Sequence, residues 1–356
     1  MTSKKKITIV TGPMAGHGGE ESVITNFINH FADTYDFELY VSQMLGDSVW
    51  LKRLDERTQI TIGTAGAGRI TKAGKLLRYM WRCDADAVIV FTPRLLFLTN
   101  LARKLYFRHF KLISWVQFSI NDYFSTRDRG YLALADEHLA ISGGIRQQLM
   151  DIGINQSRIH LIYNPIPKSN QTILPENQET NFIYVARIQF NQQKNMQALF
   201  DACVQLKGAW ALHIYGTDST ANQDEYRQCV AYIKRLKIES HIVWHGWIAD
   251  VWSKIEHADA LVLTSTFEGF GMVLAEGISR GIPAISFDCP VGPADIINKY
   301  NGFLINNGDV TQFATAMQKF VDRKVYFSAT HVKKSITTLY EDVYYPRTAE
   351  LLNKLL

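Results

Sequence analysis

Residues 260–288, ALVLTSTFEGFGMVLAEGISRGIPAISFD, contain two short apolar runs, ALVL and PAISF, of the kind that form buried strands. Between these runs we expect a helix that begins near Met272 and ends at Gly281, because glycine is a common helix stop and Pro283 opens the next strand. A strand, a loop, a helix and another apolar strand in succession predict parallel strands covered by helices.

The same alternation recurs along the rest of the chain. Strand-like runs are KITIV, FELYVS, AVIVF, KLISWV, HLAIS and IHLIY in the first half, then NFIYVA, ALHIYG and HIVWHG. We therefore expect an α/β fold with two Rossmann-like domains that face a cleft. The polar segment Asn164–Asn181 contains three prolines and has the composition of a linker between them.

These patterns predict the domain boundaries. We expect an N-terminal domain over 1–165, a linker over 166–180, a C-terminal domain over 181–330 and C-terminal helices over 331–356. The last segment is predicted to form two helical pieces separated at Pro346 and to pack back on the first domain.

Composition indicates a folded protein in a reducing cytosol. A chain of 356 residues exceeds one ordinary core, and its apolar content of 47% and charged content of 20% are those of globular proteins. The four cysteines form no CxxC pair, so neither a zinc ribbon nor a disulfide framework is indicated. No signal-peptide-like run and no clean apolar stretch of about 20 residues occurs, so we expect neither secretion nor a membrane span.

Two glutamates, Glu268 and Glu276, flank the glycines Gly269 and Gly271 at the expected start of the helix. A helix N-terminus presents unpaired N–H groups and partial positive charge, which suit a phosphate or sugar oxygen. The carboxylates can accept hydrogen bonds from hydroxyls at the two ends of one ligand, each worth roughly 1.5–3 kcal/mol. From spacing alone, solvated surface charges explain the two glutamates equally well.

Two further segments follow strands in the same way. In YVARIQFNQQKNM, Arg187 follows a strand and Lys194 precedes a helix, an arrangement that can grip a diphosphate. In TGPMAGHGGEE, Gly16, Gly18 and Gly19 precede a helix without the GxGxxG or P-loop pattern, so a dinucleotide site is not indicated. Taken alone, two loop cations are more often solvated, and a glycine loop is equally consistent with a turn that binds nothing.

Together these segments resemble the GT-B glycosyltransferases, specifically the retaining nucleotide-sugar enzymes of glycosyltransferase family 4, over nearly the whole chain. The E-x7-E pattern of that family matches Glu268 and Glu276, its R…K pair matches Arg187 and Lys194, and its first-domain glycine loop matches GHGGEE. Further matches are ADEHLAIS, IYNPI, HGW and NGFLINNGD. An ordered series of this length is far more specific than any one of its motifs.

The resemblance implies that the C-terminal domain binds a UDP-sugar and that the N-terminal domain binds the acceptor. Glu276 would bind the ribose, while Glu268, Arg187 and Lys194 would be catalytic, the two cations stabilising the departing diphosphate. The full implied donor-binding set is Gly18, Gly19, Arg187, Lys194, Trp247, Glu268, Gly269, Phe270, Gly271, Met272, Val273 and Glu276. No metal or other cofactor is expected, since the chain shows no DxD-like pair and no cluster with metal-ligand spacing.

One position departs from the family pattern. Members often carry a histidine after the SW strand, whereas ISWVQFSINDYF has Gln117, which can hydrogen-bond a hydroxyl but cannot act as a base. In the mechanism usually described for this family, the leaving phosphate takes the acceptor proton, so a missing base is tolerable. We expect His17, Gln117 and Asp122 as acceptor contacts, although a lone histidine is more often structural.

Positive charge is concentrated in the first domain. From Arg69 to Lys111 ten basic residues stand against two acidic ones, a local charge of +8 in a chain whose net charge is +4. A helical spacing of three or four residues is shared by Arg69, Lys72, Lys75, Arg78 and Arg82. We expect this basic face on an anionic membrane surface, with the protein peripheral on the cytoplasmic face of the inner membrane. A merely solvated face is the alternative, and nucleic acid is a poorer partner because no binding fold accompanies the charge.

Within the family, GGEESVITNFI, ISGGIRQQLMDIGI and FDCPVGPADII resemble the lipopolysaccharide 1,6-galactosyltransferases. That resemblance implies UDP-galactose as donor and a hexose of the lipopolysaccharide core as acceptor. A teichoic acid or capsule glycosyltransferase that uses UDP-glucose or UDP-N-acetylglucosamine fits the same residues. From other classes, a UDP-sugar epimerase and a non-catalytic UDP-sugar-binding subunit remain open.

Overall fold

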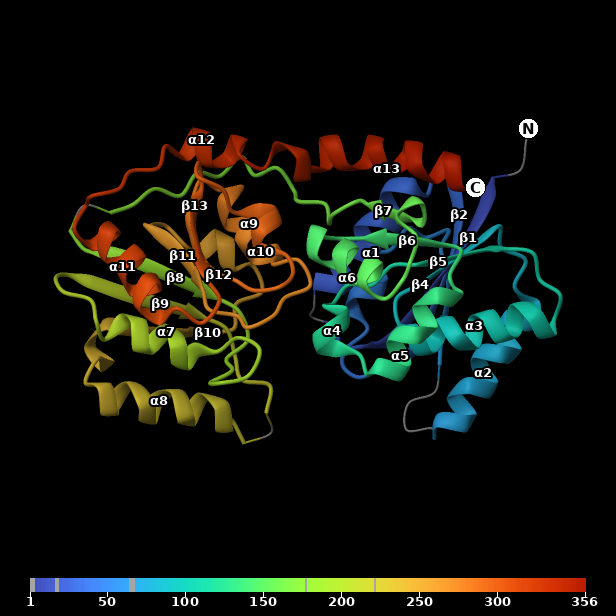
Figure 1. Ribbon diagram of the computed structural model, residues 1–356, viewed down its shortest axis with the longest axis horizontal. Coiled ribbons are helices and arrows are strands. Elements are labelled where there is room, and N and C mark those ends of the chain that lie inside the picture. Colours follow the sequence, from blue (N-terminus) through green and yellow to red (C-terminus); the bar gives the residue numbers. More distant parts are fainter. Residues whose placement is uncertain (1–3, 17–18, 64–67, 177, 221) are drawn as a thin grey trace. The chain divides into compact units, whose positions relative to one another are not determined.

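The chain forms two compact units, each a parallel sheet with helices on its faces (Figure 1). The computed structural model describes residues 4–16, 19–63, 68–176, 178–220 and 222–356. The first unit comprises Met1–Pro165 and Tyr344–Leu356, and the second comprises Ile166–Val343.

The first unit has a seven-stranded sheet within the described residues. Its strands are β1 (Lys5–Met14), β2 (Tyr35–Met44), β3 (Gln59–Ile62), β4 (Ala87–Val90), β5 (Lys111–Ser114), β6 (Glu137–Ala140) and β7 (Ile159–Leu161). They pair in parallel in the order β3-β2-β1-β4-β5-β6-β7, so the strand order reverses between β1 and β4. Ligands of such sheets bind at this reversal, beyond the carboxyl ends of the strands.

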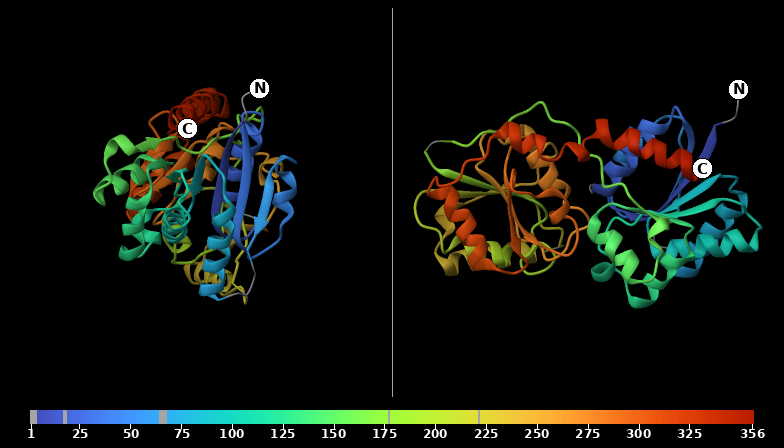
Figure 2. Two further views of the ribbon diagram at one scale, coloured as in Figure 1. Left: turned by 90° about the vertical axis from the view of Figure 1, so that its right-hand side faces the viewer. Right: turned by 45° about the horizontal axis from the view of Figure 1, so that its top comes forward.

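Helices cover both faces of this sheet, because crossovers between parallel strands need them. They are α1 (Gly19–Phe31), α2 (Arg69–Arg82), α3 (Pro93–Leu105), α4 (Ile120–Tyr123), α5 (Thr126–Gly130) and α6 (Gly143–Asp151), joined by most of α13 (Glu341–Leu355). The ring of Tyr345 on α13 stacks on that of His30 on α1 at 3.6 Å, and Asn353 Oδ1 accepts a hydrogen bond from Tyr35. Figure 2 shows α13 along this part of the first unit.

The prediction of two helical pieces separated at Pro346 was wrong, because Pro346 lies inside α13. A proline inside a helix removes one hydrogen bond and costs about 3 kcal/mol or more. Here tertiary contacts offset that cost. Tyr344, Tyr345, Thr348 and Leu352 are buried, and Arg347 Nη2 donates to the carbonyl oxygen of Ile162 at 2.7 Å. Packing therefore overrides the local preference of proline.

The second unit has a six-stranded sheet within the described residues. Its strands are β8 (Thr180–Val185), β9 (Trp210–Tyr215), β10 (Ile242–Gly246), β11 (Ala260–Leu263), β12 (Ala284–Asp288) and β13 (Gly302–Asn306). They pair in parallel in the order β10-β9-β8-β11-β12-β13, and here the reversal lies between β8 and β11.

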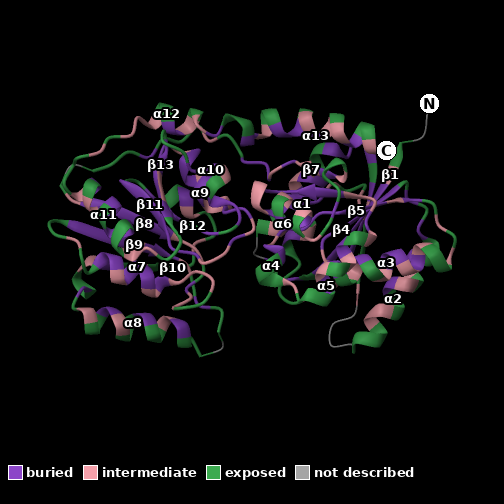
Figure 3. Cartoon of the chain, viewed as in Figure 1, coloured by how far each residue is buried: buried purple, intermediate pink, exposed green. Residues whose placement is uncertain are grey.

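The helices of the second unit again connect its parallel strands. They are α7 (Met196–Cys203), α8 (Asp224–Leu236), α9 (Met272–Ile278), α10 (Pro293–Ile296), α11 (Val310–Val321) and α12 (Ala329–Lys334). Figure 3 shows the central strands and the inward helix faces of each unit as buried. The predicted α/β class with two Rossmann-like sheets is therefore confirmed.

Residues 166–180, expected as a linker, lie within the second unit. Ile173 is buried, Ile166 forms a β-bridge with Tyr340, and Leu174 forms one with His257. The polar composition of this segment reflects its exposed positions, while the buried side chains of Ile166 and Ile173 attach it to the unit.

Among the described residues, no helix combines the length and the apolar character that crossing a membrane requires.

Candidate active site

The second unit gathers charged side chains at the strand reversal between β8 and β11. Lys194 follows β8 and Glu268 follows β11, and their side chains pair with Lys194 Nζ 2.6 Å from Glu268 Oε1. These side chains are only 12% and 9% exposed, respectively. The hydroxyl of Thr264 donates to the carbonyl oxygens of Lys194 and Asn195, which ties the two loops together. The structure thus joins two residues that lie 74 positions apart in sequence.

Arg187 lies at the same edge, two residues after β8, and is exposed. Its Nη2 donates to Gln193 Oε1 at 3.1 Å, and Gln193 Nε2 donates to the carbonyl oxygen of Phe267 at 3.1 Å. Gln193 therefore connects the loop that carries Arg187 with the loop that carries Glu268. The motifs gave no signal for Gln193, because an amide in a polar loop resembles any solvated residue.

The glycine turn between the two glutamates forms as predicted. Gly271 has φ +89°, a left-handed conformation that suits glycine, and α9 begins at Met272 immediately after it. The helix ends at Ile278, three residues before the expected stop at Gly281. Phe270 is buried, while Gly269, Met272 and Val273 are half-buried.

Glu276 lies on α9 and has a different partner from Glu268. Its Oε2 accepts a hydrogen bond from the indole Nε1 of Trp252 at 2.9 Å. Burial raises the pKa of Glu276, and the Trp252 hydrogen bond and the charge of Arg280 oppose that shift. Trp252, which is buried, escaped the sequence reasoning because a lone tryptophan after a strand resembles a core residue.

Trp247 is exposed just after β10, at the edge of the sheet. Strands β9 and β8 lie between β10 and β11, so the sheet does not bring Trp247 next to the Glu268 loop. Its assignment to the donor site stays a prediction.

In the first unit the glycine loop follows β1, at the reversal between β1 and β4. Gly16 has φ +94°, and its N–H donates to Glu21 Oε1 at 2.8 Å. Glu21 is buried and thereby fastens the loop to α1, which begins at Gly19. Burial, reinforced by the Glu21 carboxylate, raises the pKa of Glu20 to about 8. The predicted residues His17 and Gly18 lie outside the described residues.

Gln117, three residues after β5, is paired with a second amide. Asn164 Nδ2, three residues after β7, donates to Gln117 Oε1 at 3.1 Å. Both side chains are buried, with residue exposures of 7% and 3%, yet Gln117 Nε2 and Asn164 Oδ1 have no partner among the described residues. Asp122 is exposed on α4 and accepts a hydrogen bond from Ser119, so Asp122 and Gln117 are not joined directly.

Comparison with known proteins identifies the family. The protein family described as "Glycosyl transferases group 1" matches residues 179–323. The lipopolysaccharide 1,6-galactosyltransferase of Escherichia coli (strain K12) is 34% identical over 98% of each chain. The enzyme of the same name from Salmonella typhimurium (strain LT2) is 31% identical over 96% of each chain. The chain belongs to the group 1 glycosyltransferases.

Solved structures agree with this assignment. The lipopolysaccharide outer core galactosyltransferase WaaB matches with a TM-score of 0.87 and 30% identity, over 99% of this chain and 100% of that one. Anabaena HepE in complex with UDP matches with a TM-score of 0.80 at 18% identity over 98% of this chain, which supports the fold alone. The predicted family, the GT-B fold class and the enzyme class, a hexosyltransferase of glycosyltransferase family 4, are therefore confirmed.

The basic face of this group 1 glycosyltransferase lies on α2. Arg69, Lys75, Arg78 and Arg82 are exposed, whereas Lys72 is half-buried and donates from Nζ to Gln43 Oε1 at 2.6 Å. The opposite face of α2 buries Leu76 and Met80. Four of the five predicted basic side chains are thus accessible to a partner.

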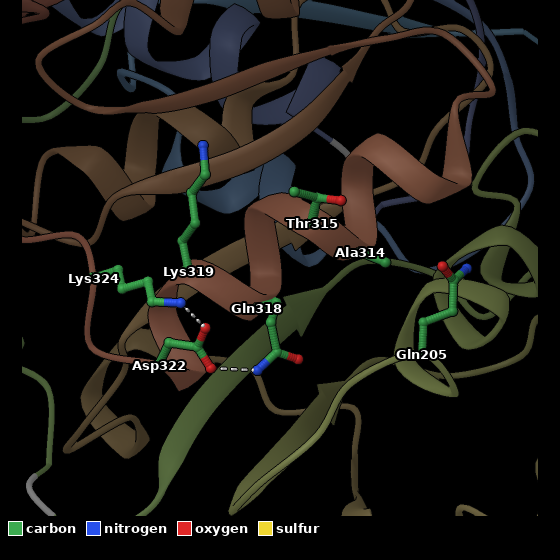
Figure 4. A pocket seen from close by; sticks show the side chains of 7 residues that line it. All are labelled: Gln205, Ala314, Thr315, Gln318, Lys319, Asp322 and Lys324. Carbon is green, nitrogen blue, oxygen red and sulfur yellow. Dashed lines mark hydrogen bonds and ion pairs between the residues drawn. The ribbon is translucent and has the colours of Figure 1, made fainter.

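A surface depression in the second unit of this glycosyltransferase is separate from the predicted site (Figure 4). It is lined by Gln205, Ala314, Thr315, Gln318, Lys319, Asp322 and Lys324, with Asp322 accepting from Gln318 and Lys324. None of the predicted donor residues lines it. Among the described residues, no group of three or more His, Cys, Asp or Glu side chains has a metal-binding arrangement.

Proposed function

We propose that this enzyme transfers galactose, with retention of configuration, from UDP-galactose to a hexose of the lipopolysaccharide core. The observation that carries the donor half is the charged cluster at the strand reversal of the second unit. Lys194 and Glu268 meet there at 2.6 Å, with Arg187 in the adjoining loop. The full-length similarity to the lipopolysaccharide 1,6-galactosyltransferases of E. coli and S. typhimurium supports the choice of galactose and of the core acceptor.

Each charged residue has a separate role in this reaction. Arg187 binds the diphosphate through its planar guanidinium, and its only hydrogen bond from the guanidinium to a described residue goes to neutral Gln193. Lys194 carries three donors, so it can hold Glu268 with one and a phosphate oxygen with another. Glu268, fixed by Lys194, accepts hydrogen bonds from hydroxyls of the transferred sugar, and Glu276 accepts from the ribose.

The transfer breaks the bond between the anomeric carbon and the diphosphate oxygen and forms a bond from the same carbon to the acceptor oxygen. Negative charge develops on the departing UDP, and Arg187 and Lys194 stabilise it. The proton of the acceptor hydroxyl passes to the leaving phosphate oxygen. Gln117 fits this scheme, because an amide can bind a hydroxyl without having to accept a proton. We assign Gln117, with Asp122 and His17, to the acceptor side.

The direct test uses purified enzyme, a lipopolysaccharide core that lacks the outer galactose, and three donors: UDP-galactose, UDP-glucose and UDP-N-acetylglucosamine. We expect turnover with UDP-galactose, an α-linked product by NMR, and loss of turnover in Glu268→Gln. The matched control is Glu239→Gln, an exposed glutamate of the second unit. Turnover of another donor, or of a teichoic acid or capsule acceptor instead, would overturn the donor or acceptor assignment while leaving the enzyme class intact.

We also propose that α2 places the enzyme on the anionic cytoplasmic face of the inner membrane. Four exposed cations on α2 are accompanied by Ile70, which is 90% exposed, and Trp81, which is 54% exposed. Each cation near an anionic surface contributes about 1 kcal/mol, and exposed apolar side chains add to binding by entering the interface.

Vesicle co-sedimentation tests this membrane surface. Replacing Arg69, Lys75, Arg78 and Arg82 with Gln should strongly reduce binding to vesicles that contain phosphatidylglycerol, with UDP binding unchanged. The control replaces four exposed lysines of the second unit, Lys207, Lys234, Lys237 and Lys254, and removes the same charge. Equal binding by both variants would show that general charge, and not α2, drives association.

A further inference from the structure

We propose that Trp252 is a positioning residue for the nucleotide, which anchors one oxygen of the Glu276 carboxylate so that the other oxygen can accept hydrogen bonds from the ribose diol. This inference rests on the proposed role of Glu276. Trp252 lies on a short helical turn, Val251–Lys254, and its indole is buried. Its Nε1 donates to Glu276 Oε2 at 2.9 Å. An indole N–H can only donate, so this bond requires an acceptor oxygen on Glu276.

A second set of contacts holds the indole in place. The guanidinium of Arg280 lies 4.7 Å from the centroid of the Trp252 ring, and its Nη1 donates to the carbonyl oxygen of Glu276 at 3.0 Å. Arg280 Nε donates to Gln171 Oε1 at 3.3 Å, and Gln171 Nε2 donates to the carbonyl oxygen of Trp252 at 2.9 Å. Trp252, Arg280, Gln171 and Glu276 therefore form a closed circuit of contacts. Such a circuit restricts the rotamers of both the indole and the carboxylate.

The circuit leaves one oxygen of Glu276 available. Oε2 is held by Trp252, whereas Oε1 accepts no hydrogen bond from the described residues. A carboxylate with one anchored oxygen presents its other lone pairs in a fixed direction, as a cis-diol requires. The ligand that fits is a nucleoside diphosphate with both ribose hydroxyls, as opposed to a deoxyribonucleotide.

The same circuit acts on the charge of Glu276. Burial raises the pKa of this carboxyl, while the Trp252 N–H and the Arg280 charge act in the opposite direction. Removing the indole N–H should therefore raise the pKa of Glu276 further and leave more of it protonated at a given pH. A protonated carboxyl loses acceptor capacity for hydroxyls, so nucleotide affinity should become more sensitive to acid.

The experiment measures the affinity of the full-length enzyme for UDP and for 2′,3′-dideoxy-UDP by calorimetry. We expect Trp252→Phe, which keeps an aromatic ring but lacks the N–H, to weaken UDP binding roughly 5- to 20-fold and to leave dideoxy-UDP binding unchanged. The midpoint of the fall in UDP affinity with decreasing pH should move to higher pH in this variant. Equal weakening of both ligands, or an unmoved midpoint, would mean that Trp252 only supports packing and would overturn the inference.

Two controls separate the possible failures. Trp244→Phe removes a tryptophan that contacts Tyr226 edge-on at 4.9 Å, and it should bind both ligands like the wild type. Unchanged UDP affinity in Glu276→Ala would refute the ribose assignment itself. Reduced affinity in Glu276→Ala together with wild-type behaviour of Trp252→Phe would refute only the role of Trp252.

A second measurement does not depend on the stability of Trp252→Phe. In a ¹H–¹⁵N spectrum of the wild-type enzyme, the indole N–H of Trp252 should resonate downfield, because it donates to a charged oxygen. That signal should move upfield in Glu276→Ala and stay in place in Glu239→Ala. An indole signal that is indifferent to the loss of Glu276 would overturn the proposal.

Discussion

The polar groups beyond the carboxyl ends of the strands differ between the two units in charge and in how completely they are paired. In the second unit, Lys194 and Glu268 form a nearly buried ion pair, and Glu276 receives the indole N–H of Trp252. In the first unit, the pair Gln117 and Asn164 is neutral and leaves one donor and one acceptor without a described partner. The buried charges Lys194 and Glu268 are thus paired with each other, whereas the buried amides Gln117 and Asn164 keep polar atoms without a described partner.

This difference has a physical meaning. A charged group that is buried with its partner keeps its geometry before a ligand arrives, because losing the partner would be costly. A buried amide atom without a partner is itself unfavourable, and a hydroxyl that supplies the missing hydrogen bond relieves that cost. We infer that the second unit is preorganised for one class of donor, while the first gains its last contacts from the acceptor.

Breaking the ion pair should have the largest effect. Lys194→Ala leaves the carboxylate of Glu268 nearly buried and alone, which should destabilise the second unit by about 3–5 kcal/mol and abolish measurable transfer. The double variant Lys194→Met with Glu268→Leu should recover most of the stability without activity. The free energy of unfolding of the second unit is measured in urea, with hydrogen exchange of second-unit peptides as the readout. Lys207→Ala is the control. If Lys194→Ala were as stable as the wild type, the proposal that the ion pair is preorganised would be wrong.

Arg187 should show that the charged edge also contains a group reserved for the ligand. Because its guanidinium is exposed and donates only to neutral Gln193 among the described side chains, Arg187→Ala should leave stability nearly unchanged. UDP affinity should fall roughly 10- to 100-fold, since charge-assisted bonds are worth about 1.5–3 kcal/mol. Arg187→Lys should recover only part of it. Calorimetry measures the UDP affinity of each variant. Wild-type UDP affinity in Arg187→Ala would show that Arg187 does not bind the diphosphate.

The stability of the first unit should depend on pH through one buried neutral histidine, His138. His138 is fully buried with Nδ1 2.6 Å from the hydroxyl of Ser114, and burial, reinforced by Arg158 and His160, lowers its pKa to about 4. Between pH 6.5 and pH 4, His138 is therefore protonated in the unfolded chain but stays neutral in the folded chain. Stability that is present above pH 6.5 is lost as the pH falls towards 4, by about 2 kcal/mol at pH 5.

The measurement for His138 is the free energy of unfolding of the first unit at pH 7 and pH 5. The loss between the two values should shrink in His138→Gln, whatever the absolute stability of that variant. His109→Gln, which removes an exposed histidine, should keep the wild-type loss. The same pH dependence in all three proteins would exclude His138 as its source.

The smallest effect is expected at the paired amides. Gln117→Leu and Asn164→Leu each leave one buried amide without its partner. The loss of stability in the double variant should therefore be about 1 kcal/mol smaller than the sum of the losses in the two single variants. In transfer assays, Gln117→Leu should raise the KM for the acceptor and leave UDP affinity unchanged. Additive stabilities would indicate that the two amides do not interact in solution.

The sequence predicts the buried strands well, whereas two of the four edge strands of the described sheets are missed. Strands such as β4 and β11 are continuous apolar runs, because both of their faces are covered. The two missed strands, β3 and β13, lie at sheet edges, and all four residues of β3 are exposed. The exposed run QITI of β3 therefore carries little of the apolar signal that identifies a strand, whereas β13 is a short apolar run, FLI, between Gly302 and Asn306.

The sequence also predicts only some of the residues of the candidate site. Glu268, Glu276, Arg187 and Lys194 stand in sequence motifs that match the pattern of the family. Two residues that support them, Gln193 and Trp252, have spacings fixed only by the folded packing of distant segments. The sequence therefore identifies the residues of the motifs more readily than the residues that support them in the fold.

The attachment of Gln171 to Trp252 also bears on how such enzymes can be recombined. A chimera that takes its second unit from this chain and joins it at Asn181 would omit Gln171 and the Ser169 carbonyl that receives the ammonium of Lys333. Such a hybrid would retain every residue of the family motif in that unit and still lack part of the support behind Glu276. We expect functional exchange of donor specificity between relatives only when the crossover lies at or before Ile166 and the whole segment travels with the unit.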